Sequence, residues 1–152
     1  MPIASGSTFA AVPAGWGQVQ AICDWAHEHI RFDYDAVTPE KSASDTLRDR
    51  AGVCRDFSHL GITLCRALNM PARAVSAYAW QLDPPDFHAV FEVYLDGGWW
   101  LVDPTRLAPV EGLVRIGIGR DAADIAFLTT TGPCMSVSQS VTVVEAAGAI
   151  AG

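Results

Sequence analysis

Apolar and polar residues follow two different periods along the chain, and the change of period divides it into a helical part and a strand-forming part. Before Pro71 the apolar residues recur at steps of three and four, as on the buried face of an amphipathic helix. This pattern predicts helices over residues 16–31 and 54–69, with a short helix over residues 45–50 between them. After Pro71 the period becomes two, which is typical of strands.

The second part of the chain is expected to contain five strands, separated by turns that are rich in glycine and proline. These strands are predicted over residues 72–80, 87–95, 99–103, 110–118 and 136–145. Residues 95–98 are expected to form the loop of an antiparallel hairpin between the second and third strands. Helices followed by a run of adjacent strands are typical of an α+β fold.

Length and composition indicate one folded domain. The chain has 152 residues, enough to bury a sizeable core, and its 50% hydrophobic and 18% charged residues exclude a disordered chain. We expect the domain to span residues 14–146. Residues 1–13 are expected to be a loose arm or the edge of a truncated chain, and residues 147–152 a frayed tail.

The acidic charge excludes two classes of partner. With a net charge of −7 and a pI near 4.8, the chain has no basic stripe to bind nucleic-acid phosphates or an anionic membrane surface. The N-terminus lacks the features of a signal peptide, and no apolar run is long enough to span a membrane. The four cysteines form no Cys-x-x-Cys pair, which favours reduced thiols in a cytoplasmic protein over disulfides or a zinc site.

Cys54 is the first candidate for chemistry. Gly52 suits the end of the preceding helical turn, so Cys54 is expected at or near the N-terminus of the next helix. There, unpaired N–H groups and the positive end of the helix dipole favour the thiolate, which is the nucleophilic form of cysteine. Arg55 assists this effect and Asp56 opposes it. The alternative is a small buried cysteine that begins a core helix and has no chemical role.

His88 and Asp103 form the second candidate group. In the predicted hairpin Val90 faces Asp103, so His88 becomes the diagonal neighbour of Asp103 on the same face of the sheet. A carboxylate there can accept the Nδ1–H of the imidazole, while the other nitrogen holds the proton of a thiol. Cys54, packed across the sheet, would complete a set of nucleophile, base and orienting group. The alternatives are a hydrogen-bonded core histidine and an aspartate that forms a turn.

A third group of polar residues lies on the first long helix. Asp24, His27 and Glu28 share one face at steps of three and four, a spacing that can hold the metal ion of a hydrolase. The solvated face of an amphipathic helix explains the same pattern more simply. No run of carboxylates has the spacing of a calcium loop. We therefore predict neither a metal nor a cofactor.

Five segments carry a resemblance to a known family. They are residues 52–57 (GVCRDF), 69–73 (NMPAR), 87–89 (FHA), 102–105 (VDPT) and 119–124 (GRDAAD). In these segments the chain resembles the bacterial transglutaminase-like domains, which belong to the papain-like cysteine-enzyme superfamily. The similarity extends from about residue 16 to residue 145, and it implies N-terminal helices with the nucleophile helix packed on an antiparallel sheet.

The resemblance also implies a reaction. Cys54 would be the nucleophile, His88 the general base and acid, and Asp103 the orienting group of a triad that transfers acyl groups from amides of peptides or proteins through a thioester. Such an enzyme would be a transglutaminase-like acyltransferase, or a cysteine protease or amidase. The backbone N–H of Cys54 is expected to be one oxyanion donor.

Three aromatic residues are candidates for the second oxyanion donor or for the groove wall: Trp16, Tyr34 and Trp80. Each of them also suits an ordinary place in the core or at the groove wall. Bacterial members often carry an additional N-terminal β domain, which would be missing from this chain. The competing hypothesis is a non-catalytic domain that uses the same fold to bind a peptide.

Overall fold

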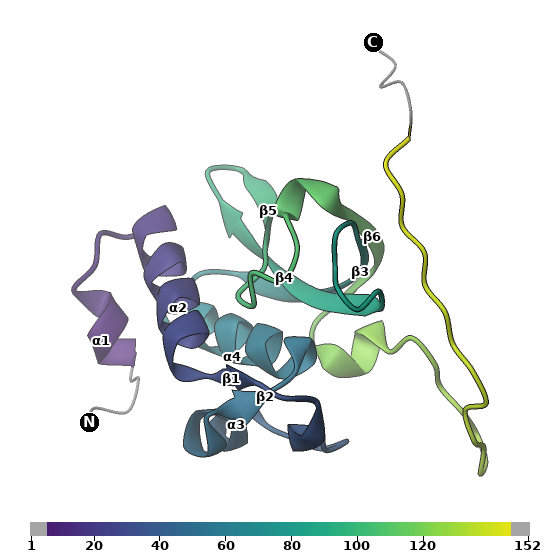
Figure 1. The fold of residues 1–152 in the computed structure, drawn as a ribbon. Coiled ribbons are helices and arrows are strands. Elements are labelled where there is room, and N and C mark those ends of the chain that lie inside the picture. The colour runs from purple at the N-terminus through teal and green to yellow at the C-terminus, as the bar shows by residue number, and fades with distance from the viewer. Residues whose placement is uncertain (1–5, 147–152) are drawn as a thin grey trace.

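A computed structural model of the chain describes residues 6–146 and has a helical part followed by a sheet (Figure 1). The helical part consists of α1 (Gly6–Ala10), α2 (Trp16–His29), the 3-10 turn η1 (Tyr34–Ala36), α3 (Ala43–Asp49) and α4 (Cys54–Ala67). The sheet contains β3 (Ala72–Ala79), β4 (Phe87–Leu95), β5 (Gly98–Val102) and β6 (Leu113–Gly119). Two further 3-10 turns flank β6, η2 (Val110–Gly112) and η3 (Ala122–Ile125).

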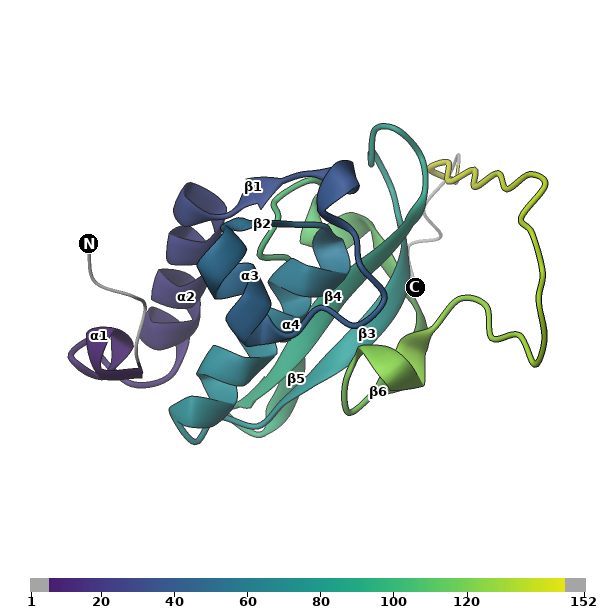
Figure 2. The same ribbon diagram turned by 90° about the horizontal axis from the view of Figure 1, so that it is seen from below.

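The sheet has the order β5-β4-β3-β6 and is antiparallel throughout. Helix α4 lies against β4 and β3, and α2 and α3 pack on α4 from outside, as the two views agree (Figures 1 and 2). A separate parallel pair, β1 (Arg31–Phe32) and β2 (Ala51–Gly52), connects the end of α2 to the start of α4. The predicted α+β fold with α4 on an antiparallel sheet is confirmed.

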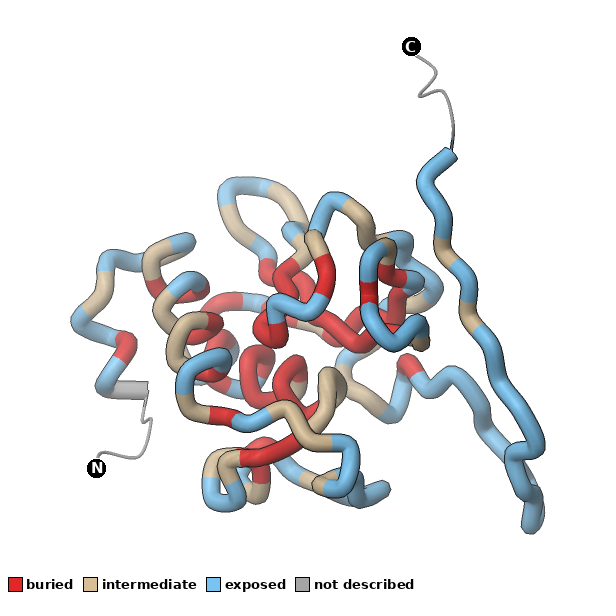
Figure 3. The backbone as a smooth tube through the Cα atoms, viewed as in Figure 1, coloured by how far each residue is buried: buried red, intermediate tan, exposed pale blue. Residues whose placement is uncertain are grey.

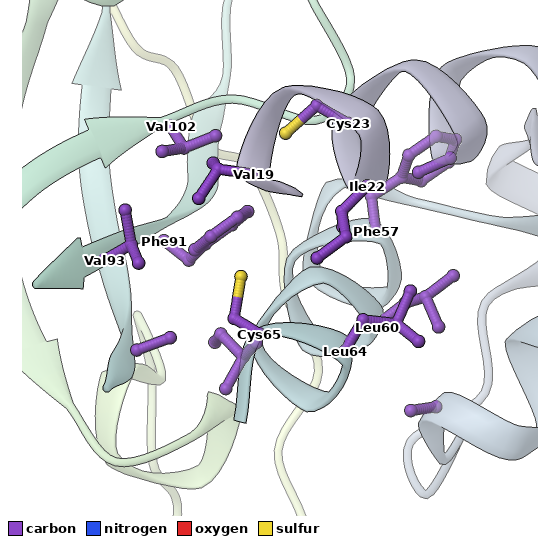
Figure 4. Close-up of a cluster of buried hydrophobic side chains, with 14 of the residues drawn as sticks. Val19, Ile22, Cys23, Phe57, Leu60, Leu64, Cys65, Phe91, Val93 and Val102 are labelled. Atoms are coloured by element: carbon purple, nitrogen blue, oxygen red, sulfur yellow. The ribbon is translucent and has the colours of Figure 1, made fainter. Parts of the chain in front are cut away.

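Helix α4 is central because one of its faces is almost wholly apolar. Leu60 and Cys65 are fully buried, and Phe57 is nearly so. Figure 4 shows this face of α4 meeting Val19 and Ile22 from α2 on one side and the sheet on the other. The backbone tube in Figure 3 accordingly has its buried residues where the helices meet the sheet. Burial of this apolar face provides most of the free energy that orders α4.

The hairpin of β4 and β5 has the predicted register, with Tyr94 opposite Trp99 and Leu95 opposite Gly98. Its two central residues, Asp96 and Gly97, have φ angles of 50° and 84°, as a tight turn between twisted strands requires. The pairing fixes the positions of all later residues on β5. Asp103 therefore follows directly at the end of β5.

Two predictions about the ends of the chain are wrong. Residues 136–145 form no strand, because their backbone has no ladder partner in the described part of the chain and side chains such as Val137 remain 93% exposed. The loose arm expected before residue 14 contains α1, whose Phe9 is only 3% exposed and packs in the core. The strand predicted over 110–118 begins three residues later, after η2. Residues 147–152 lie outside the described residues.

The close crossing of α4 over β4 gives a test of the core. A Cβ atom at Gly61 would lie 2.7 Å from Cε1 of Phe91, and Phe91 is fully buried. We expect Gly61→Leu to lower the free energy of unfolding by about 2–3 kcal/mol through overpacking. Ala67→Leu, on an exposed part of the same helix, should change it by less than about 0.5 kcal/mol. Urea denaturation of both variants measures the difference, and equal effects would contradict the close crossing.

Candidate active site

Cys54 is the first residue of α4, and the chain before it leaves little freedom in its position. The β1–β2 pair holds Gly52, where an added Cβ would lie 2.7 Å from Cβ of Asp56. The carboxylate of Asp56 accepts the N–H of Val53 at 3.0 Å. The first helical hydrogen bonds run from the N–H groups of Asp56 and Phe57 to the Val53 carbonyl. The helix therefore provides no acceptor for the N–H of Cys54, which remains available at the positive end of the dipole.

Arg55 and Asp56, which were expected to have opposite effects on the thiolate of Cys54, form an ion pair with each other. Asp56 is 1% exposed, and its Oδ1 atom accepts from the guanidinium of Arg55 at 3.1 Å. Arg55 also donates to the carbonyl of Thr38 at 2.7 Å. The negative charge of Asp56 is thus neutralised by an adjacent cation and by the Val53 N–H. Cys54 therefore begins a helix in which the buried carboxylate of Asp56 is already paired with a cation.

A hydrogen bond fixes α4 relative to β4 close to the candidate histidine. The hydroxyl of Ser58 donates to the carbonyl of Ala89 at 2.9 Å, and both groups are buried. Ser58 lies one helical turn after Cys54, and Ala89 directly follows His88. Ser58 is not among the residues predicted from the sequence. Its signal was a hydroxyl at the i+4 position from Cys54 within an otherwise apolar face.

His88 and Asp103 meet as the hairpin register predicts, with His88 Nε2 lying 2.8 Å from Asp103 Oδ2. Both side chains are 1% exposed. The side chain of Cys54 lies close enough to the imidazole of His88 to contribute to raising its pKa. The three side chains expected from the sequence therefore gather in one place, with the histidine hydrogen-bonded to Asp103 and close to Cys54.

The ring of His88 is oriented opposite to the prediction. We expected Asp103 to accept from Nδ1, but it pairs with Nε2. Because Asp103 occupies Nε2, Nδ1 is the ring nitrogen left for the nearby sulfur of Cys54. Strand register places side chains on a face, but it does not determine which ring nitrogen reaches which neighbour.

The surroundings of His88 favour its charged form. Burial lowers the pKa of the imidazole, but hydrogen bonds to Asp103 and Cys54 and the negative charges of these groups outweigh burial and raise it from 6.5 to about 9. An imidazolium stabilised in this way favours an adjacent anion, such as a thiolate at Cys54. The arrangement can hold a nucleophilic sulfur next to a proton donor.

The three aromatic candidates lie in different places. Tyr34 packs edge-on against Phe32 with ring centroids 5.2 Å apart, and burial, the charge of Asp86 and the charge of Cys54 together raise the pKa of its phenol. Trp16 packs edge-on against Trp100 at 6.1 Å and lines a cavity of about 270 Å³ that also borders Asp103. Trp80 lines a separate cavity of about 380 Å³. Of the three, Tyr34 is the one whose phenol is influenced by the charge of Cys54.

The alternative metal site on α2, formed by Asp24, His27 and Glu28, does not have the geometry of a metal site. Asp24 accepts from the amide of Gln20 at 2.8 Å and pairs with the guanidinium of Arg106. Within residues 6–146 no three histidine, cysteine or acidic side chains come together in a geometry that could hold a metal ion. The pattern on α2 is that of a polar face, with Asp24 connecting it to the loop after β5. The helices in the same part of the chain are all too short or too polar to cross a membrane.

Comparison with known proteins identifies the class to which this fold and site belong. A family model of the transglutaminase-like superfamily matches residues 6–104. This match covers more than half of the chain and includes Cys54, His88 and Asp103. The chain belongs to the transglutaminase-like superfamily.

Individual relatives agree with this assignment. An uncharacterised protein of Mycobacterium leprae is 32% identical over 120 residues, covering 71% of this chain and 42% of that protein. A crystal structure titled as a "putative cysteine protease" from Cytophaga hutchinsonii has 50% sequence identity and a TM-score of 0.77, covering 79% of this chain and 42% of that chain. The periplasmic domain of TgpA from Pseudomonas aeruginosa, at 24% identity and a TM-score of 0.53, covers 69% of this chain and 44% of that chain and shares the fold. The chain thus spans less than half the length of these relatives.

Proposed function

We propose that this chain is a cysteine-dependent enzyme that transfers acyl groups from amide substrates of peptides or proteins through a thioester. The observation that carries the proposal is the contact of His88 with Asp103, at 2.8 Å, beside the thiol of Cys54, which contributes to raising the pKa of the imidazole. These side chains come from the start of α4, from β4 and from the end of β5. A buried His–Asp pair with a shifted histidine pKa, close to a thiol at a helix N-terminus, is typical of a functional site.

In the first half of the reaction, the Cys54 thiolate attacks the carbonyl carbon of the amide and forms a C–S bond. The negative charge moves to the carbonyl oxygen, where the free N–H of Cys54 is one donor. His88 then gives the proton on Nδ1 to the amide nitrogen, because Nε2 is bound to Asp103. The C–N bond breaks, the amine or ammonia leaves, and the acyl group remains as a thioester.

In the second half, an amine or a water molecule attacks the thioester. Neutral His88 takes a proton from this nucleophile at Nδ1, and the C–S bond breaks to restore the thiolate and the imidazolium. Asp103 keeps its charge and stabilises the imidazolium in both halves. Tyr34 is the candidate for the second oxyanion donor, since the charge of Cys54 influences its phenol and the residue is exposed.

The competing proposal is a non-catalytic domain that binds a peptide on the same fold. The whole protein represented by its longer relatives could carry the catalytic function elsewhere, because this chain covers only 42% of two of them. Against this, all three positions of the triad are filled, and the imidazole is charged beside the thiol. The two proposals differ in whether Cys54 is more reactive than an ordinary thiol.

Alkylation with iodoacetamide at varied pH separates these proposals. Burial raises the pKa of Cys23 and that of Cys65 to about 12, so these thiols should not react under native conditions, and the exposed Cys134 provides the reference rate. We expect Cys54 to react about tenfold faster than Cys134 at pH 6, and His88→Ala to remove this advantage. Mass spectrometry of the labelled peptides gives each rate. Equal rates for Cys54 and Cys134 at every pH would overturn the enzymatic proposal.

A second measurement distinguishes transferase from hydrolase. Glutamine-containing peptides are incubated with and without a fluorescent primary amine. Incorporation of the amine supports acyl transfer to amines, and release of ammonia or of a shorter peptide alone supports hydrolysis. The relative from Cytophaga hutchinsonii is titled as a protease, so peptide cleavage is the outcome to examine first.

A further inference from the structure

Thr105 holds the carboxylate of Asp103 from the side opposite to His88. Its backbone N–H and its hydroxyl both donate to Asp103 Oδ1, at 2.9 Å and 2.6 Å. The other carboxylate oxygen, Oδ2, is bound to His88 Nε2 at 2.8 Å. Both oxygens of Asp103 are therefore engaged, which fixes the plane of the carboxylate as well as its position.

The hydroxyl of Thr105 has a fully assigned set of partners. Its single proton goes to Asp103 Oδ1, and its oxygen accepts the N–H of Leu107 at 3.2 Å. The same oxygen lies 3.5 Å from His88 Nε2. Because the hydroxyl proton is already used, this oxygen can only accept from the ring nitrogen. The contact therefore favours a proton on Nε2 of His88.

A proton fixed on Nε2 determines what the imidazole offers to the sulfur. In the neutral ring one nitrogen carries the proton and the other carries a lone pair. With Nε2 protonated by the joint effect of Asp103 and Thr105, the lone pair lies on Nδ1, the nitrogen left for Cys54. Thr105 and the side chain of Asp103 are both buried, so water does not compete freely for these hydrogen bonds.

We propose that Thr105 is a positioning residue, which orients Asp103 and selects the tautomer of His88 that can exchange a proton with Cys54. This proposal rests on the function proposed above and adds a fourth side chain to it. Thr105 acts through Asp103 and His88. Residue 105 lies in the segment 102–105 that carries the family resemblance, but no role was predicted for it from the sequence.

The test uses two variants that separate the hydroxyl from the rest of the side chain. Thr105→Val keeps the shape and the backbone N–H but removes the hydroxyl, and Thr105→Ser keeps the hydroxyl. We expect alkylation of Cys54 at pH 7 to slow by about tenfold in Thr105→Val, as for loss of a hydrogen bond to a charged group. In Thr105→Ser it should stay within about twofold of the original rate.

The second readout is the tautomer itself. At about pH 10, above the pKa of about 9 at which His88 loses its charge, the 15N NMR signals of the neutral imidazole should report a proton on Nε2 in the original protein and in Thr105→Ser. In Thr105→Val they should report a mixture of both tautomers. A merely structural role would lower the melting temperature of Thr105→Val without changing these signals. Unchanged signals together with an unchanged alkylation rate would overturn the proposal.

Failure of the two proposals can be told apart. If Cys54 of the original protein is no more reactive than Cys134, the enzymatic function fails, while the 15N comparison still decides the role of Thr105. If Thr105→Val does not fold, Thr105→Ala replaces it in both measurements, with the same expected contrast to Thr105→Ser. An identical tautomer in the alanine and serine variants would then overturn the positioning role.

Discussion

Replacing the sulfur of Cys54 with oxygen should abolish turnover of amides while leaving the fold in place. Cys54→Ser keeps the helix start and the backbone N–H, but an imidazole does not ionise a serine hydroxyl as it does a thiol. We expect kcat/KM for an amide substrate to fall by about 10³-fold or more. Because Cys54 is only half-buried, the free energy of unfolding should change by less than about 1 kcal/mol.

Cys134→Ser is the matched control for this substitution. Cys134 is exposed and lies in the irregular segment after η3, so its loss should alter neither turnover nor stability. Both variants are assayed for product release and unfolded in urea. A Cys54→Ser protein that turns over substrate at the original rate would exclude the thioester route, whatever its stability.

Much of this site could be predicted because it depends on local rules. The start of α4 at Cys54 was predicted correctly. The signals were a glycine two residues before Cys54 and an apolar helical pattern after it. The hairpin was predictable for a similar reason, since Asp96 and Gly97 suit positive φ angles and the loop length sets the register. From that register the proximity of His88 and Asp103 follows directly.

The features that could not be predicted depend on neighbours that are distant in sequence. Glu92 is fully buried and pairs with Arg73 at 2.7 Å and also with Arg115. These arginines lie on β3 and β6, and the order of strands in the sheet cannot be read from a period of two. The predicted orientation of the His88 ring was wrong for the same reason, because the orientation depends on Cys54 and Asp103 together.

The C-terminal segment illustrates the limit of propensity. Residues 136–145 alternate valine with serine and threonine, which suits a strand. A strand also needs a partner with free hydrogen-bonding groups, and this segment instead makes a side-chain contact, in which Gln139 donates to Asp86 at 2.9 Å. Before the segment, Phe127 stacks on Phe87 with ring centroids 4.3 Å apart. These contacts lie at the start of β4, directly before His88.

Removing the carboxylate of Asp103 should have the second large effect. Asp103→Ala leaves the Nε2–H of a histidine that is 1% exposed without its partner. Without this charge, burial and the lost hydrogen bond both lower the pKa of His88 from its value of about 9. The imidazolium that supports the thiolate is then lost near neutral pH. We expect turnover at pH 7 to fall by about 10²- to 10⁴-fold, as for the orienting carboxylate of other triads.

Asp103→Asn separates the charge of this group from its hydrogen bond. The amide oxygen of asparagine can still accept from Nε2 and fix the ring, but it carries no charge. Turnover of Asp103→Asn should therefore lie between that of the original protein and that of Asp103→Ala. Equal losses in the two variants would mean that the charge alone matters, and an unaffected Asp103→Ala would contradict the proposed orienting role.

The effect of Asp103→Ala on stability should depend on pH in a specific direction. The pKa of His88 is raised in the folded state, so its protonation stabilises the fold below pH 6.5, and this contribution is lost as the pH rises through about 9. The difference between these values corresponds to about 3 kcal/mol. Asp103→Ala should thus destabilise the protein most near pH 6 and progressively less toward pH 9.5, measured by urea denaturation. Because the same imidazolium is proposed to hold the thiolate, the pH at which this stability difference declines should also be the pH at which the reactivity advantage of Cys54 over Cys134 disappears.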